Sequence, residues 1–241
     1  MDGGYYQRSS GPERERFVRA IWTVFFKDLS IETSGGGVFP AVAAFAVVIA
    51  SVLHFTNVFP SAPAVTNAAP AVFWISTLFA ATIAFERSFE VERKSEAIRM
   101  VLMSPVDRGA VFIGKTLANL FLLTAVQAVF VPVFALFFSL DVLPVLGPFA
   151  ATVFAGTVGV AAVGTALSAL SAQTSMKGAI FPVLLFPLLI PVLISASESL
   201  SAVLGGAPAG DFPRHMKALI SFDFAFLAAG TLVYGYIIDD V

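Results

Sequence analysis

The sequence predicts an all-α membrane protein with six transmembrane helices and an amphipathic helix ahead of the first of them. Of the 241 residues, 58% are hydrophobic and only 12% are charged, and the mean hydropathy is +0.89. Ordinary soluble domains carry roughly 25% charged residues. A soluble fold of this length could not bury so much apolar surface. Six apolar runs of membrane-crossing length complete the prediction.

Residues 13–34 are predicted to form the amphipathic helix, after a lead of residues 1–12 that we expect to be disordered. Apolar side chains recur at helical spacing, opposite a stripe of basic and polar ones. The apolar set is Phe17, Val18, Ile21, Trp22, Val24, Phe25 and Leu29, and the polar set is Arg16, Arg19, Thr23, Lys27 and Ser30. This pattern is typical of an interfacial helix lying in the plane of the membrane, with its basic residues at the headgroups. A helix packed on a soluble partner is the alternative.

The predicted permease domain covers residues 38–238 and holds the six apolar segments. A helix needs about 20 residues to cross about 30 Å of hydrocarbon, so each segment can span. The segments are 38–59, 68–85, 109–138, 142–170, 179–196 and 218–238. The third and fourth are longer than a span requires, and we expect tilt or an interfacial extension there. Lys115, near the start of the third, is expected to snorkel to the surface.

The distribution of Lys and Arg predicts the orientation. Twelve of the 14 lie before the first segment, around the connection between the second and third, or between the fourth and fifth. Only Arg214 and Lys217 lie on the opposite side. The positive-inside rule therefore predicts a multi-pass protein of the cell (inner) membrane with both termini in the cytoplasm.

Residues 86–108 form the one densely charged stretch between apolar segments, and they are the predicted contact site on the cytoplasmic side. Glu86, Glu90, Glu92 and Glu96 alternate there with Arg87, Arg93, Lys94 and Arg99. Such a sequence can form a short surface helix supported by pairs of opposite charge. A solvated connector is the alternative. Ser104-Pro105 ends that helix, and Asp107 is placed to cap the next one.

Small and polar residues inside the spans predict close helix packing. Ala155 and Gly159, and again Gly164 and Ser168, lie four residues apart, a spacing that lets helix backbones approach closely. We interpret these rows as internal packing rather than a homodimer seam. The amides of Asn119 and Gln127 are expected to hold helices together rather than to line a path.

Three prolines in the fifth segment, Pro182, Pro187 and Pro191, predict a bent helix. Each removes a backbone donor and frees a carbonyl, so the bends are hinge candidates, although a fixed shape remains the alternative.

Few residues could carry catalysis or bind metal. Glu198, Asp211 and Asp223 are expected at or near the outer ends of their spans, and His54 and His215 are isolated imidazoles near the same face. A haem or metal ligand is conceivable at either histidine, but a surface histidine is the simpler interpretation.

Several function classes are excluded by what the sequence lacks. Without cysteine there are no disulfides, thiolate metal sites or covalent haem attachment. No phosphate-binding loop or hydrolase motif occurs, so we expect neither enzymatic activity nor a resident cofactor in this chain. The net charge of −2 gives no indication of nucleic-acid binding, and no cleavable signal peptide is visible.

Four motifs resemble those of the CcmB family, the haem exporter protein B permeases of the cytochrome c maturation ABC system. The order and spacing agree from about residue 16 onward. The motifs are Ala69-Pro70-Ala71-Val72-Phe73-Trp74, Ala84-Phe85-Glu86-Arg87-Ser88-Phe89-Glu90, Leu102-Met103-Ser104-Pro105-Val106 with Gly114-Lys115, and Lys177-Gly178-Ala179 before Leu185-Phe186-Pro187-Leu188-Leu189-Ile190-Pro191-Val192-Leu193-Ile194.

This resemblance implies a six-helix fold of the ABC-2 exporter type and a homodimeric permease. It also implies a separate ABC ATPase subunit (CcmA-like) that supplies ATP hydrolysis, and a haem-handling membrane subunit (CcmC-like). Residues 86–103 would be the coupling helix, with Glu86 and Arg87 matching the family's Glu-Arg pair; Ser95-Glu96-Ala97 departs from the family's pattern. The candidate coupling residues are Glu86, Arg87, Glu90, Arg93, Glu96 and Ile98.

The leading hypothesis is a permease subunit that couples ATP hydrolysis to haem export or to release of a haem-loaded chaperone. The alternatives are an ABC-2 permease for another amphiphile, such as a lipid, glycan or drug, and a non-transporting scaffold for haem-handling subunits.

Overall fold

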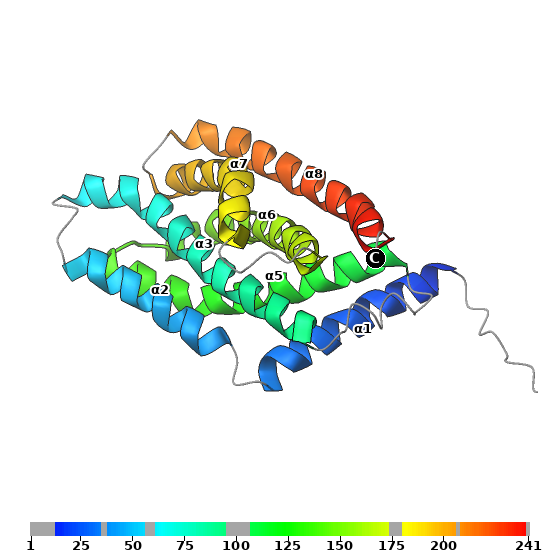
Figure 1. The fold of residues 1–241 in the computed structure, drawn as a ribbon. Coiled ribbons are helices and arrows are strands. Elements are labelled where there is room, and N and C mark those ends of the chain that lie inside the picture. The colour runs from blue at the N-terminus through cyan, green and yellow to red at the C-terminus, as the bar shows by residue number, and fades with distance from the viewer. Residues whose placement is uncertain are drawn as a thin grey trace, which may run out of the picture.

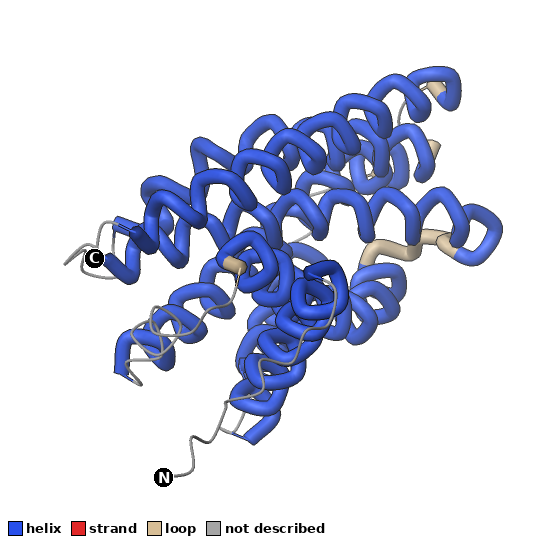
Figure 2. The backbone as a smooth tube through the Cα atoms, turned by 90° about the vertical axis from the view of Figure 1, so that its right-hand side faces the viewer, coloured by secondary structure: helices blue, strands red, loops and turns tan. Residues whose placement is uncertain are grey.

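The fold is all-helical over the residues that the computed structural model describes, which are 13–34, 38–55, 61–94, 107–173, 180–205 and 208–239 (Figure 1). Seven α-helices lie in these ranges. They are α1 (Glu13–Ser34), α2 (Val38–Phe55), α3 (Ala62–Lys94), α5 (Arg108–Phe137), α6 (Leu146–Gln173), α7 (Ile180–Leu204) and α8 (Phe212–Asp239). Two short 3₁₀ turns, η1 (Leu143–Val145) and η2 (Ala209–Asp211), precede α6 and α8. Figure 2 shows the same helices turned by 90°, gathered into one bundle.

Each of the six predicted segments corresponds to one helix, from α2 to α8. Four helical stretches are long and apolar enough to cross a membrane by length and composition, namely Thr66–Glu86, Arg108–Phe137, Leu143–Leu170 and Phe181–Leu204. The chain is thus a multi-pass membrane protein. The stretches within α2 and α8 are not among these four, so the count of six spans stays a prediction.

Helix α6 is the centre of the bundle and packs against α3, α5, α7 and α8. Its glycines make this possible, because neighbouring side chains fill the space where a Cβ would be. A Cβ at Gly156 would lie 2.1 Å from the Trp74 ring, and one at Gly159 would lie 2.8 Å from Val192. The predicted internal role of the small residues in this helix is therefore confirmed.

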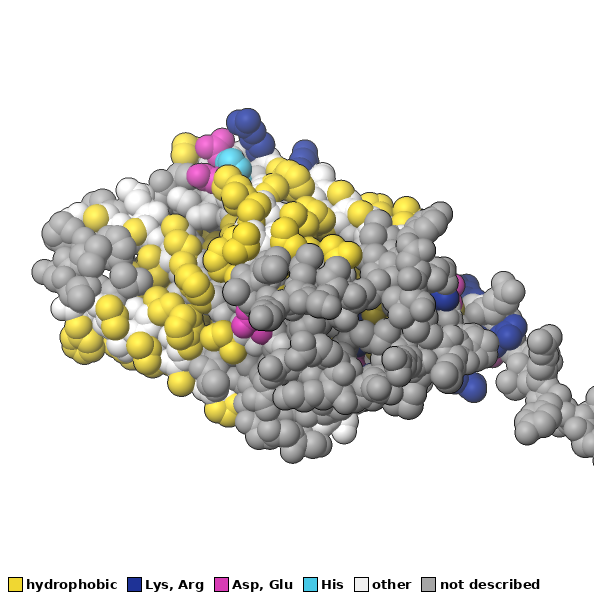
Figure 3. Space-filling model, in the orientation of Figure 1, with side chains coloured by type: hydrophobic (Ala, Val, Ile, Leu, Met, Phe, Trp, Pro, Cys, Tyr) yellow, Lys and Arg dark blue, Asp and Glu magenta, His cyan; other side chains and the backbone are white. Residues whose placement is uncertain are grey.

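Aromatic and aliphatic side chains from α3, α5, α6 and α7 form the core. The ring of Phe73 stacks on Phe130 at 5.5 Å and meets Phe134 and Phe149 edge-on. From α7, Leu185 and Leu189 are fully buried beside them. Many hydrophobic side chains are exposed on the outside, among them Phe79, Leu136 and Phe224. In Figure 3, hydrophobic side chains cover much of the described part of the face that is shown. An apolar outer surface suits a bundle whose solvent is lipid.

The helices alternate in direction, so their connections gather at two ends of the bundle. At one of them, which we call the α3–α5 end, α3, α6 and α8 end while α5 and α7 begin. Phe85 meets Phe181 there at 6.4 Å, and Phe112 meets Tyr234 at 5.6 Å. At the opposite α7–α8 end, α5 and α7 end while α6 and α8 begin. The described parts of the predicted contact site, residues 86–94 and 107–108, belong to the α3–α5 end.

Candidate functional site

The charged turns after Phe85 continue α3 instead of forming a separate surface helix. The helix is 33 residues long and runs unbroken from Ala62 to Lys94. At about 1.5 Å per residue it measures about 50 Å, well beyond the ~30 Å of a bilayer core. Residues 86–94 therefore continue the helix of the second predicted span beyond its apolar part.

The predicted coupling residues are distributed along this extension and the connection after it. Glu86, Arg87, Glu90 and Arg93 lie on α3, and the side chain of Glu86 is half-buried. The side chains of the other three lie outside the described part of the structure, and so do residues 95–106, which include Glu96 and Ile98.

Phe85 fixes the point where the extension leaves the bundle. Its ring is fully buried and contacts Gly164 of α6, where a Cβ would lie 2.2 Å from the ring. The Phe181 ring of α7 meets it from another side. Phe85 therefore contacts two other helices at the point where the charged turns begin.

The start of α5 is fixed by a cap and by close packing. Oδ1 of Asp107 accepts a hydrogen bond from the Ala110 amide at 3.1 Å, which confirms the predicted N-cap. The next residue but one, Gly109, lies against Thr231 of α8, whose Cγ2 would be 2.9 Å from a Cβ. The connection from α3 therefore returns to a firmly held helix.

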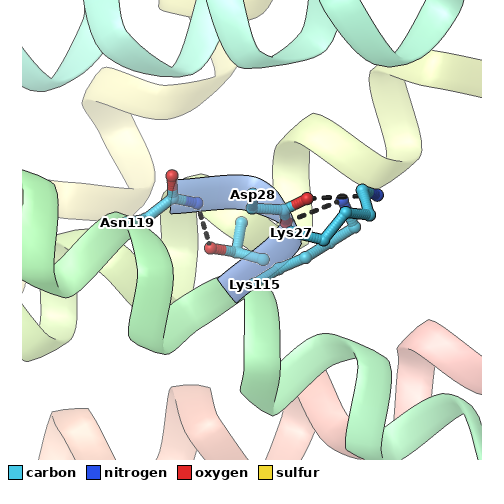
Figure 4. A network of polar contacts seen from close by, with 5 residues as sticks. Lys27, Asp28, Lys115 and Asn119 are labelled. Carbon is cyan, nitrogen blue, oxygen red and sulfur yellow. Dashed lines mark hydrogen bonds and ion pairs between the residues drawn. The ribbon is translucent and has the colours of Figure 1, made fainter. Parts of the chain in front are cut away.

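Lys115 does not snorkel to the surface as the sequence predicted; it is 9% exposed and paired with helix α1 (Figure 4). Its Nζ donates to Oδ2 of Asp28 at 3.3 Å, and the Lys27 ammonium lies 3.1 Å from the other oxygen of that carboxylate. Beside this pair, a Cβ at Gly114 would lie 2.8 Å from the carbonyl oxygen of Ile21. Together these contacts hold α1 against the first half of α5.

The two amides of α5 both bind α6, as expected. Nδ2 of Asn119 donates to Oγ1 of Thr165 at 2.9 Å (Figure 4), and the Thr157 hydroxyl donates to Oε1 of Gln127 at 2.9 Å. Hydrogen bonds between helices replace the hydrophobic drive that lipid does not supply. These contacts join α5 to the central helix at two depths.

Two of the three prolines lie in the interior of the helix that contains them, which continues through both. Pro187 and Pro191 lie inside α7, where each removes a donor and crowds the preceding turn. Pro182 is the third residue of the helix, where the amide has no intrahelical partner in any case. Pro182 therefore removes no intrahelical hydrogen bond, and the bend expected at this residue has no cause in the backbone hydrogen bonding.

Asp223 is the polar group whose place the sequence reasoning missed. Helix α8 begins at Phe212, so Asp223 lies about three turns inside the helix, and its side chain is buried. Its Oδ1 would be 2.5 Å from a Cβ at Gly159, and it has no hydrogen-bond partner among the described residues. An ionisable group at such a position is a functional candidate. The sequence reasoning placed the start of this segment at residue 218, whereas α8 begins six residues earlier, at Phe212.

The described part of the chain contains no cluster of three or more His, Asp or Glu that could hold a metal ion. His215 is half-buried near the start of α8, and the side chain of His54 lies outside the described residues. The α3–α5 end thus combines charged residues, the continuous helix α3 and close helix contacts.

Comparison with known proteins gives one consistent result. A family model described as CcmB protein matches residues 19–235. The heme exporter protein B of Paracoccus denitrificans is 28% identical over 210 residues, which cover 87% of this chain and 90% of that protein. The heme exporter protein B of Bradyrhizobium diazoefficiens is 28% identical over 223 residues, 90% of this chain and 99% of that protein. The Pseudomonas aeruginosa protein of the same name is 28% identical over 166 residues, 68% of this chain and 72% of that protein.

Proposed function

The chain belongs to the CcmB protein family, and from this premise we propose that it is the permease subunit of an ABC transporter complex in cytochrome c maturation. It couples ATP hydrolysis by a separate ATPase subunit to haem export or to the release of a haem-loaded chaperone. The name heme exporter protein B, which its relatives carry, supports haem as the substrate. The chain itself is a non-catalytic membrane subunit.

The proposed topology has six spans formed by α2, α3, α5, α6, α7 and α8, in the arrangement of an ABC-2 exporter. The α3–α5 end faces the cytoplasm, because twelve of the 14 Lys and Arg residues belong to that side of the topology. Both termini then lie in the cytoplasm. Residues 13–34 lie at the surface of the inner membrane, and residues 1–12 precede the folded part.

The observation that carries the proposal is the unbroken helix α3. Its charged turns, with Glu86, Arg87, Glu90 and Arg93, are continuous with an apolar stretch of spanning length. A partner that grips residues 86–98 on the cytoplasmic side moves a rigid lever, and Phe85 passes that movement to Gly164 and Phe181. Residues 86–108 are the coupling segment in this account, and Glu96 and Ile98 complete its contact surface.

The proposed hinge lies in α7. Pro187 and Pro191 weaken the backbone hydrogen bonding of α7 about two and three turns after Phe181, the residue that contacts Phe85. A push on α3 is therefore converted into bending of α7, while Pro182 leaves the first turn intact. Helix bending at prolines is a recognised way for a span to change shape without breaking.

The proposed partners are a CcmA-like ATPase, a CcmC-like haem-handling subunit and a second copy of this chain. The ATPase binds the coupling segment from the cytoplasm, where it supplies the nucleotide chemistry that this chain lacks. Haem is substrate here and not a resident cofactor, and no nucleic acid takes part.

The test replaces both members of the Glu-Arg pair and measures binding and maturation together. In E86A/R87A, we expect the ATPase to co-purify at a small fraction of the native amount and mature cytochrome c to fall in parallel. The matched control is E198A/R214A, which removes an exposed pair of charges at the α7–α8 end. Membrane insertion should be unchanged in both variants. Native ATPase binding and native cytochrome c levels in E86A/R87A would overturn the proposal.

A further inference from the structure

Helix α1 has two apolar faces, of which only one is covered by the protein. The covered face contains Ile21 and Val24, which lie against Gly114, and Asp28, which pairs with Lys115. Phe25 meets Phe121 of α5 at 6.1 Å along the edge of this face. This inner side of α1 is thus the side that packs on α5.

The second apolar face points away from α5. Val18, Trp22 and Phe26 follow one another at one-turn spacing and are 44%, 50% and 61% exposed. The rings of Trp22 and Phe26 stack at 5.8 Å. Exposed Trp in a membrane protein is enriched at the bilayer interface, where the ring has one apolar and one wet side.

Basic side chains lie around this exposed stripe. Arg14, Arg16 and Arg19 are exposed on the first turns of α1 and outnumber the one exposed acidic residue described among them, Glu15. Asp28, further along the helix, is engaged by Lys27 and Lys115. A shallow depression of about 400 Å³ opens beside the stripe, lined by Arg14, Glu15, Val18 and Arg19. In Figure 3, Lys and Arg side chains are seen at the right-hand tip of the molecule.

We propose that this face of α1 binds anionic phospholipids of the cytoplasmic leaflet. Val18, Trp22 and Phe26 insert among the acyl chains, while Arg14, Arg16 and Arg19 bind the headgroup phosphates, an arrangement that suits an interfacial amphipathic helix. The inference rests on the proposed cytoplasmic orientation of the α3–α5 end. The inference adds a lipid ligand to the proposed function. Because α1 is attached to α5 through contacts at Gly114 and Lys115, binding of α1 to the anionic leaflet also positions α5 relative to the membrane surface.

The chain provides its own probe for this site. It has two tryptophans, and Trp74 is 1% exposed in the core while Trp22 is half exposed. Subtracting the fluorescence of a W22F variant from that of the native chain isolates the Trp22 signal. Lipids with brominated acyl chains quench a tryptophan that touches them.

The experiment places the full chain in nanodiscs of phosphatidylcholine and phosphatidylglycerol, with bromine carried by one lipid or the other. At equal mole fraction, we expect brominated phosphatidylglycerol to quench Trp22 at least about twofold more strongly, because basic residues enrich anionic lipid around them. R14Q/R16Q/R19Q should abolish this difference, and R214Q/K217Q at the α7–α8 end should leave it intact.

Three results would overturn the inference. Equal quenching by the two lipids would remove the preference for anionic headgroups, and no quenching by either would remove the lipid contact. Quenching that disappears when the ATPase is added would assign the face to a protein partner. The assay requires neither ATPase nor haem, so its failure is separate from a failure of the coupling proposal in E86A/R87A.

Discussion

The ring of Phe85 on α3 occupies the space that a side chain at Gly164 of α6 would need, with ring atoms 2.2 Å from the position of a Cβ. This contact lies where the apolar part of α3 passes into its charged turns. It joins the proposed lever to the central helix of the bundle, and several expected outcomes depend on it.

Replacing Gly164 by alanine should displace Phe85 and destabilise the α3–α6 contact. Overpacking a close contact costs typically about 1–3 kcal/mol, so we expect a lower midpoint in thermal unfolding of the detergent-solubilised protein. G147A is the control, because a Cβ at Gly147 would meet no atom within 4 Å. The explanation fails if the two variants unfold at the same temperature.

Removing the Lys115 ammonium should weaken the attachment of α1 to α5. In K115M, the half-buried Asp28 keeps only the exposed Lys27 of its two cationic partners. The loss in free energy of unfolding should lie between about 1 kcal/mol, as for an exposed ion pair, and about 3 kcal/mol, as for a buried one. K27M touches the same carboxylate from a side chain that is 42% exposed and should cost less. Limited proteolysis of the N-terminal helix measures both. Equal release of α1 from K115M and K27M would contradict the pairing.

The Asn119–Thr165 hydrogen bond should show coupling in a double-mutant cycle. Combining N119L and T165V should give an interaction energy of roughly 0.6 kcal/mol, the average for such bonds within membranes. Thermal unfolding of the two single variants and the double variant supplies the numbers. Additive effects would show that the two side chains do not stabilise each other.

Replacing Asp223 by asparagine should leave the fold intact or stabilise it. Oδ1 of Asp223 has no partner in the described part of the chain, and a buried carboxylate without partners is costly. D223N keeps the shape against Gly159 and Val192 without the ionisable group. An unfolding midpoint well below that of the native chain would indicate that the carboxylate has a stabilising partner.

The helices themselves were predictable because the apolar runs are long and the breaks between them are sharp. The predicted segment 109–138 differs from α5 by one residue at each end, and the cap at Asp107 follows from its position before that segment. The role of the small residues in α6 was predictable as well, since lipid offers helices little other reason to approach.

The tertiary partners were not predictable from local pattern. Lys115 was expected to snorkel because local sequence shows no partner for it. Its partner, Asp28, lies 87 residues away in the chain. The direction of residues 86–94 was missed for a related reason: their charges predict a helix but not its continuity with α3. Asp223 was misplaced because α8 begins six residues before its apolar run, and a helix start within polar residues leaves no hydropathy signal.

The location of Glu90 tests the central claim most directly. The chain has no cysteine, so E90C introduces a single thiol on the charged turns of α3. A membrane-impermeant maleimide should label it in inverted membrane vesicles but not in intact cells, and a thiol crosslinker should join it to the ATPase subunit. Labelling from the outside of intact cells, or no crosslink when the ATPase is present, would contradict the account.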